Sequence, residues 1–135
     1  IFQNEYVPLP EELILEEGIM TEWGDYLLEV TKRDIKESSR ENGKIIFLGD
    51  KTNIKVRSRK EGDRIYLKNL GYKKIKKILI DEKIEKKERE RIPVIELDNE
   101  IAAIGDIKIS GKLELSRNAV SKEQMKLIIR RKNAK

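Results

Sequence analysis

The stretch VRSRKEGDRIYLKNLGYKKIKKILIDEKIEKKERERIP, residues 56–93, decides the fold and carries most of the basic character of the chain. It opens with a predicted strand at 56–59, and EGD at residues 61–63 follows. This tripeptide is typical of a turn, because glycine accepts a positive φ and aspartate hydrogen-bonds its own following backbone. Gly71 is a second break, after which the pattern changes to that of a helix.

The run KKIKKILI at 73–80 has apolar residues at helical spacing. Ile75, Ile78 and Leu79 fall on one stripe of such a helix, and the lysines spread across the other face. The lysines are Lys73, Lys74, Lys76 and Lys77. A basic helix beside an arginine-bearing strand is a surface that suits phosphate groups.

Composition excludes several classes of function. The 135 residues include no Cys and no His, which removes disulfides, thiolate nucleophiles, imidazole metal ligands and Ser-His couples. No apolar run approaches the roughly 20 residues that span a bilayer, so we expect no membrane contact and a cytoplasmic location. The chain begins at Ile1 rather than Met, and we therefore expect a fragment of a longer protein.

Charge is distributed unevenly along the chain. Residues 1–50 carry 5 Lys or Arg against 12 Asp or Glu, whereas residues 51–91 carry 16 against 7. Residues 92–135 carry 9 against 6, and the net charge of the whole chain is +5. The concentration of positive charge in the middle of the chain is the footprint of a surface that binds a polyanion.

The remaining sequence predicts many short strands. They are expected at 13–15, 26–31, 44–48, 94–97, 101–104, 107–109, 112–115 and 126–131. Residues 86–91 are predicted to form a short helix that ends before Pro93, and strand 44–48 is expected to pair with 55–59. The fold class is therefore α+β, with a largely antiparallel multi-stranded sheet and one or two short helices.

No catalytic centre or metal site is predicted. The sequence contains neither a Walker A motif nor a Ser-Gly-Gly-x-Asp-Ser loop, and Gly62 is a lone glycine before Asp63 and Arg64. The aspartates stand beside turn or helix-end signals, where a structural role is common, and we expect that role for Asp63.

An ordered set of motifs resembles the C-terminal domain of tRNA(Ile)-lysidine synthetase. The motifs are VRSRKEGDRI at 56–65, GYKKIKK at 71–77, DEKI at 81–84 and RERIPV at 89–94. Two positions depart from the family pattern: Glu85 replaces a usual proline, and no aromatic residue precedes Gly105. The resemblance covers about 55 residues and extends more loosely to Arg131.

The resemblance implies a tRNA-recognition domain similar in fold to a domain of phenylalanyl-tRNA synthetase. It implies a parent ligase that uses ATP, with Mg²⁺, to add lysine to the wobble cytidine of the isoleucine tRNA with a CAU anticodon. The chemistry would reside in an N-terminal catalytic domain of the same protein, so this fragment alone is expected to be inactive and to bind no cofactor. The expected division is 1–54 as a preceding strand-rich part, 55–131 as the family-type domain and 132–135 as a basic tail.

Site residues follow from the resemblance and from the basic pattern together. The predicted contacts to the acceptor stem of the tRNA are Arg57, Arg59, Arg64, Lys73, Lys74, Lys76, Lys77, Arg89 and Arg91. The predicted structural turn residues are Gly62, Asp63, Gly71 and Pro93. One arginine could instead pair with Asp63 or Glu61. Tyr66 and Tyr72 are expected in the core, with stacking on a terminal base as the alternative.

Two other functions fit the same sequence. The chain could be a generic RNA-binding or ribosome-associated module, or a protein-interaction domain whose acidic first third docks on a basic surface. The sequence also leaves the formation of a homodimer open.

Overall fold

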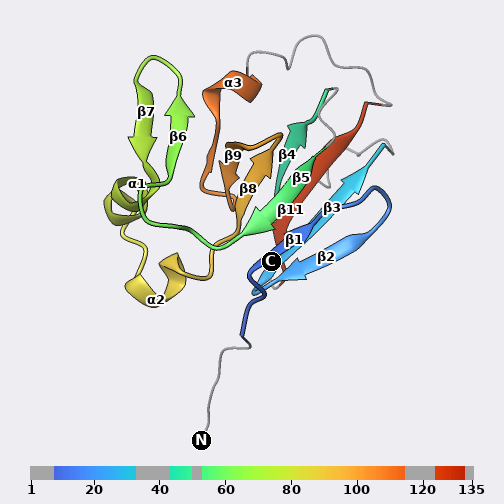
Figure 1. Ribbon diagram of the computed structural model, residues 1–135, viewed down its shortest axis with the longest axis horizontal. Coiled ribbons are helices and arrows are strands. Elements are labelled where there is room, and N and C mark those ends of the chain that lie inside the picture. Colours follow the sequence, from blue (N-terminus) through green and yellow to red (C-terminus); the bar gives the residue numbers. More distant parts are fainter. Residues whose placement is uncertain (1–7, 33–42, 50–52, 115–123, 133–135) are drawn as a thin grey trace, which may run out of the picture.

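The computed structural model describes residues 8–32, 43–49, 53–114 and 124–132 (Figure 1). Within these ranges the strands form two sheets and one separate hairpin, accompanied by short helices. The strands pair antiparallel in all three assemblies. The expected α+β fold with largely antiparallel sheets is confirmed.

The first sheet has the strand order β1-β5-β8-β9-β10. Its strands are β1 Glu12–Ile14, β5 Ile54–Arg57, β8 Val94–Leu97, β9 Glu100–Ile104 and β10 Lys108–Ile109. The turn between β8 and β9 has φ values of +50° at Asp98 and +74° at Asn99. Two successive positive φ values match the twist of a tight hairpin, and Asp and Asn tolerate them well.

The second sheet has the strand order β2-β3-β11-β4. Its strands are β2 Met20–Trp23, β3 Tyr26–Thr31, β11 Lys126–Arg131 and β4 Gly43–Phe47. In β3, Tyr26, Leu28 and Val30 are buried at alternate positions, because successive side chains of a strand point to opposite faces. The first third of the chain is thus joined to its last strand by the β3–β11 pairing.

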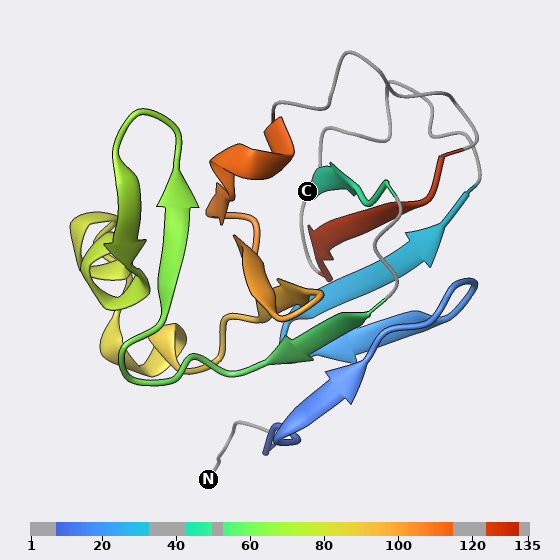
Figure 2. The same cartoon turned by 45° about the horizontal axis from the view of Figure 1, so that its top comes forward.

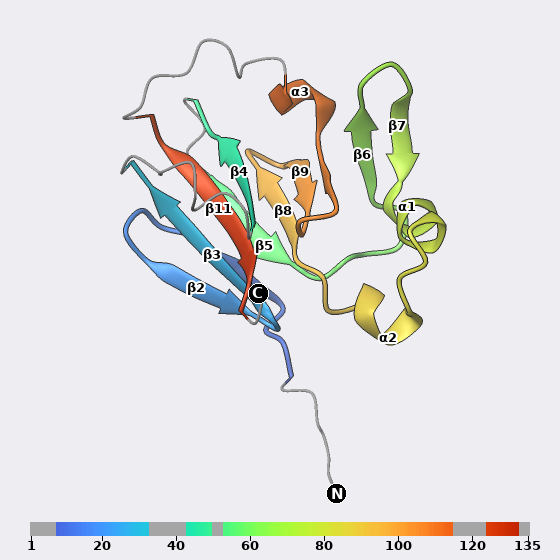
Figure 3. The ribbon, with the colours of Figure 1, turned by 180° about the vertical axis from the view of Figure 1, so that it is seen from behind.

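The two sheets pack against each other around one apolar core (Figure 3). Side chains from both sheets form it, including Leu28, Val30, Ile46, Val56, Ile95, Leu127 and Ile129. Burying a side chain of this size stabilises the fold by about 1.5–3 kcal/mol. Residues before and after the expected domain boundary, between 54 and 55, contribute to this one core. The division into two parts stays a prediction.

A smaller unit stands beside the two sheets (Figure 2). It consists of the hairpin of β6 Arg64–Leu67 and β7 Gly71–Lys74, followed by α1 Ile75–Asp81 and α2 Lys86–Arg89. A second apolar cluster joins this unit to the first sheet. The cluster contains Ile65, Ile75, Ile78, Leu79, Ile92, Val94 and Ile104.

Three local expectations differ from the structure. Strand β4 pairs with β11 and not with β5, because both edges of β5 are occupied by β1 and β8. The helix expected from residue 73 begins at Ile75, since Lys73 and Lys74 belong to β7. The prediction of a strand at 112–115 is wrong, because α3 is Gly111–Glu114, where the Ser110 side chain accepts a hydrogen bond from Lys112 N at 3.2 Å.

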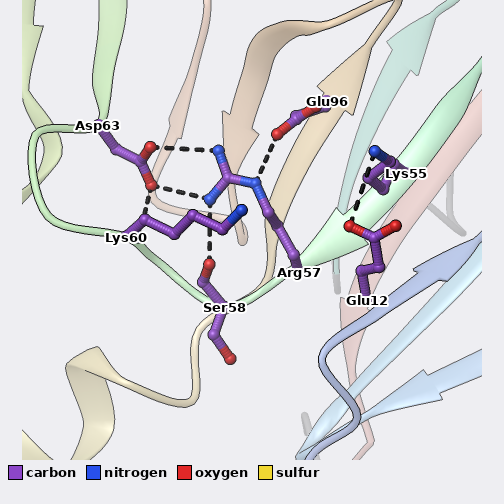
Figure 4. A network of polar contacts seen from close by, with 7 residues as sticks. All are labelled: Glu12, Lys55, Arg57, Ser58, Lys60, Asp63 and Glu96. Carbon is purple, nitrogen blue, oxygen red and sulfur yellow. Dashed lines mark hydrogen bonds and ion pairs between the residues drawn. The ribbon is translucent and has the colours of Figure 1, made fainter.

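Arg57 joins the hairpin to the first sheet (Figure 4). Its guanidinium donates two hydrogen bonds to the Asp63 carboxylate, at 2.9 and 3.1 Å, and its Nε donates to Glu96 on β8. Asp63 also accepts a hydrogen bond from Lys60 N at 2.7 Å, which closes the turn before β6. One side chain therefore connects the end of β5, the neighbouring strand β8 and the start of the hairpin.

The Arg57 side chain is only 6% exposed, so its charge is removed from water. Burial disfavours the charged form, but the hydrogen bonds to Asp63 and Glu96 outweigh it and raise the pKa of Arg57. Removing one partner of such a buried pair leaves the other charges uncompensated, and this is more costly than losing a surface ion pair.

Replacing Arg57 by Met should lower the free energy of unfolding by about 3 kcal/mol, because Asp63 and Glu96 lose their shared partner. Chemical denaturation followed by tryptophan fluorescence measures this change. Lys55→Met is the matched control on the same strand, where the ion pair to Glu12 spans 3.6 Å and is partly exposed. That control should cost about 1 kcal/mol or less. Equal losses in the two variants would contradict the role of Arg57.

Asp106 joins the two sheets through a second polar cluster. Its carboxylate accepts hydrogen bonds from Arg131 on β11, at 3.1 Å, and from the Tyr26 hydroxyl on β3, at 3.2 Å. The Arg131 guanidinium also lies 5.0 Å from the centroid of the Tyr26 ring. Burial opposes ionisation of Asp106, but the contacts to Arg131 prevail and lower its pKa below the ordinary 3.8.

A carboxylate with a lowered folded-state pKa stabilises the fold above the pKa of the unfolded chain. This stabilising contribution is lost as the pH falls through the pKa that the carboxylate has in the folded state. We therefore expect Asp106→Asn to be less stable than the parent at pH 7 and to lose less of its stability between pH 5 and about pH 2. Thermal melts across this range measure the effect, and parallel pH profiles for the two proteins would refute it.

Candidate nucleic-acid interface

The register of the β6–β7 hairpin places two cations opposite each other. Arg64 pairs with Lys74, and Tyr66 pairs with Tyr72, so these four side chains share one face of the hairpin. Arg64 and Lys74 are both exposed, and neither has an ion pair among the described residues. Like charges directly opposite each other destabilise a hairpin, and an anion bound between them would relieve the repulsion.

Two glycines with positive φ shape this hairpin. Gly62 has a φ of +89° in the turn before β6, and Gly71 has a φ of +81° where β7 begins. Side chains with a Cβ rarely adopt this conformation, so both positions favour glycine. The turn before β6 and the turn into β7 thus both contain a glycine, which is visible in the sequence.

Helix α1 continues the basic surface from the end of β7. Its buried residues are Ile75, Ile78 and Leu79, as its periodicity predicts, whereas Lys76 and Lys77 are exposed. The buried stripe fixes the helix on the second apolar cluster, and the lysine-bearing side faces water.

One carboxylate partly balances these lysines. Asp81 lies 3.1 Å from Lys73 Nζ and 3.6 Å from Lys77 Nζ. The hydrogen bond from Lys73, with a smaller contribution from Lys77, lowers the pKa of Asp81. Since Asp81 and both lysines are substantially exposed, these pairs add little to stability and remain open to competition by phosphate.

Three predicted arginine contacts are already engaged within the protein. Arg57 is buried between Asp63 and Glu96, and Arg59 donates to Glu90 at 2.9 Å. Arg89 Nε donates to the Ile84 carbonyl at 2.8 Å, which closes the chain between α1 and α2. These side chains hold the surface in place, and their contact with tRNA stays a prediction.

Arg91 and Pro93 lie at the junction with the sheets. Arg91 is half-buried next to Gly24 of the β2–β3 turn, away from the hairpin. Pro93 is buried, and its carbonyl accepts a hydrogen bond from Gly105 N at 2.8 Å. The structure therefore brings Arg64 and Lys74 together on one face of the hairpin, whereas Lys73 is on the other face and meets Lys77 at Asp81. Lys76 is exposed on α1, and Arg91 is separated from all of them.

Sequence reasoning missed the surroundings of the two tyrosines. Tyr72 is 52% exposed and Tyr66 is half-buried, and neither belongs to an apolar cluster, so the expectation of core packing is wrong. Lys112, on α3, reaches the same face, although the sequence does not mark it as a site residue. Alternation at 64, 66, 72 and 74 would have indicated the shared face, but the contact with Lys112 depends on the tertiary fold.

The arrangement is suited to binding phosphates. Among the described residues, no group of three or more acidic side chains is placed to hold a metal ion. None of the described helices is long and apolar enough to cross a membrane. The cationic surface consists of lysines and one arginine, side chains that can contact phosphates without distinguishing bases.

Comparison with known proteins gives the family. Residues 54–124 match the model of the TilS substrate C-terminal domain. The tRNA(Ile)-lysidine synthase of Clostridioides difficile (strain 630) is 42% identical over 77 residues, which are 57% of this chain and 16% of that protein. The synthase of Bacillus thuringiensis subsp. konkukian (strain 97-27) is 33% identical over 128 residues, which are 93% of this chain and 26% of that protein.

The fold is also that of a solved structure. A crystal structure described as a TILS C-terminal domain superimposes with a TM-score of 0.64 over 96% of this chain and 92% of that one, at 22% identity. This chain spans about a quarter or less of the length of these synthases. The resemblance to a phenylalanyl-tRNA synthetase domain stays a prediction. With the model of residues 54–124 covering more than half of its length, the chain belongs to the family of TilS substrate C-terminal domains.

Proposed function

We propose that this chain is the tRNA-recognition domain of a tRNA(Ile)-lysidine synthase. It holds the body of the isoleucine tRNA, at the acceptor stem, so that an N-terminal catalytic domain of the same protein reaches the wobble cytidine of the CAU anticodon. That domain attaches lysine using ATP and Mg²⁺ in the cytoplasm, and this chain supplies no catalytic group. Family membership and the cationic surface support the proposal.

The observation that carries the proposal is the pairing of Arg64 with Lys74 across the hairpin. Two exposed cations in register are unfavourable in the free protein, and they become favourable when a phosphate lies between them. Lys76 and Lys77 extend the positive surface along α1. A-form stems are recognised through shape, phosphates and 2′-hydroxyls, so a surface of this kind suits a stem better than a single-stranded sequence motif.

The predicted contacts take two different roles in this proposal. Arg64, Lys73, Lys74, Lys76 and Lys77 contact phosphates directly. Arg57, with Asp63 and Glu96, orients the hairpin that carries them. Arg59 and Arg89 are held by contacts within the protein, and Arg91 lies apart beside the β2–β3 turn, so these three charges add only to long-range attraction.

Changing Lys74 and Lys76 together to Glu should weaken binding of the isoleucine tRNA at least about ten-fold, because two attractive interactions with phosphate become repulsive. The dependence of affinity on salt concentration should become less steep by about one unit for each lysine that no longer binds a phosphate. Both lysines are exposed, so the fold should tolerate the change. Titration of the 135-residue chain with tRNA at two salt concentrations measures both effects.

The matched control is Lys44→Glu with Arg130→Glu, which makes the same change in net charge on the second sheet. Both residues are exposed, on β4 and β11, and lie outside the hairpin unit. The control should retain most of the affinity. Equal losses in both double variants would show that only net charge matters and would refute a site on the hairpin. Equal binding of an unrelated tRNA would indicate a generic RNA-binding module.

A further inference from the structure

Two tyrosines occupy the exposed face of the hairpin beside the proposed phosphate contacts. The rings of Tyr66 and Tyr72 lie with centroids 5.4 Å apart and planes inclined by 71°, an edge-to-face pair. More than half of the Tyr72 surface, 52%, is exposed. Tyr72 therefore offers exposed aromatic surface, and neither ring is part of the two apolar cores.

A polar network holds these rings in place. Lys112 Nζ lies 5.4 Å from the centroid of Tyr66 and 5.1 Å from that of Tyr72, within the range of a cation–π contact. The Tyr72 hydroxyl donates to Glu100 at 3.0 Å and accepts a hydrogen bond from Lys112 at 2.6 Å. Lys112 also forms an ion pair with Glu100. Anchoring both rings in advance reduces the entropy that a ligand would lose by ordering them.

The neighbours of the tyrosines indicate the chemistry of the ligand. Along β6, Arg64 is two residues from Tyr66, and along β7, Lys74 is two residues from Tyr72, on the same face. Two residues of extended strand span about 7 Å, so each cation lies about that far along its strand from a tyrosine. Cations beside aromatic rings on one face are typical of surfaces that bind single-stranded nucleic acid.

We propose that Tyr66 and Tyr72 form a stacking platform for an unpaired nucleobase of RNA, at a place where a base-paired stem continues into a single strand. Arg64 and Lys74, which are opposite each other at one end of the same face, hold the phosphate next to that base. This inference rests on the proposed function and deepens it. It specifies that the β6–β7 hairpin binds the RNA where a stem continues into a single strand. A stacked base adds affinity without sequence preference, since every base has an aromatic face.

The test compares two RNA hairpins with identical stems, one blunt-ended and one with a single-stranded 3′ extension of about four nucleotides, the lower end of the site sizes of single-strand binders. The extension carries 2-aminopurine at its first unpaired position, whose fluorescence falls on stacking. The full chain should bind the extended RNA about ten-fold more tightly than the blunt RNA and should quench the probe. The two affinities are measured by anisotropy at one salt concentration.

Two variants of one residue separate stacking from other effects. Tyr72→Leu keeps apolar bulk but removes the aromatic face, and its preference for the extended RNA should fall to within about two-fold. Tyr72→Phe keeps the ring and loses the hydroxyl, so it should retain most of the preference and the quenching. Thermal melts check that both variants fold.

The outcomes distinguish this inference from the function on which it rests. Equal binding of both RNAs by the parent, or an unchanged preference in Tyr72→Leu, overturns the platform. If Lys74→Glu with Lys76→Glu still weakens binding at least about ten-fold in that case, the phosphate-binding surface stands without the stacking platform. Failure of the parent chain to bind either RNA at low salt overturns both proposals.

Discussion

The burial of one charge, that of Arg57, sets the geometry of the basic surface. Its guanidinium is shared by Asp63, at the turn into the hairpin, and by Glu96, on a neighbouring strand of the sheet. A buried cation is tolerated only where its donors are satisfied, so the turn has little freedom to move relative to the sheet. The orientation of β6 and β7, and of every cation on them, follows from this constraint.

The protein uses its two kinds of cation differently. Arg57 pairs with two carboxylates inside the fold, because a planar guanidinium with several donors can satisfy both at once. Arg59 pairs with Glu90 at the surface. The lysines of β7 and α1 remain at the surface, where a compact, well-hydrated ammonium group costs little to expose. The segment rich in arginine and lysine therefore has two roles: arginine side chains hold parts of the fold together, and the exposed lysines form the proposed binding surface.

Helix α3 connects the hairpin to the first sheet at a second point. Gly111 approaches the backbone of Lys68 so closely that an added Cβ would come within 2.6 Å of Lys68 N. This contact and the hydrogen bond at Ser110 set the start of α3, from which Lys112 reaches Tyr66 and Tyr72. The aromatic face thus depends on a residue 40 positions from Tyr72 along the chain.

The sequence by itself determined the antiparallel α+β class, most strands of the two sheets and the buried stripe of α1, but it did not predict the β6–β7 hairpin. These features depend on neighbouring residues, whose periodicity and turn chemistry are visible in the chain. Only the tertiary structure decided that β4 pairs with β11, that Arg57 faces inward and that Tyr72 stays exposed. Strand partners and charge partners distant in sequence are selected by packing, and no local pattern specifies them.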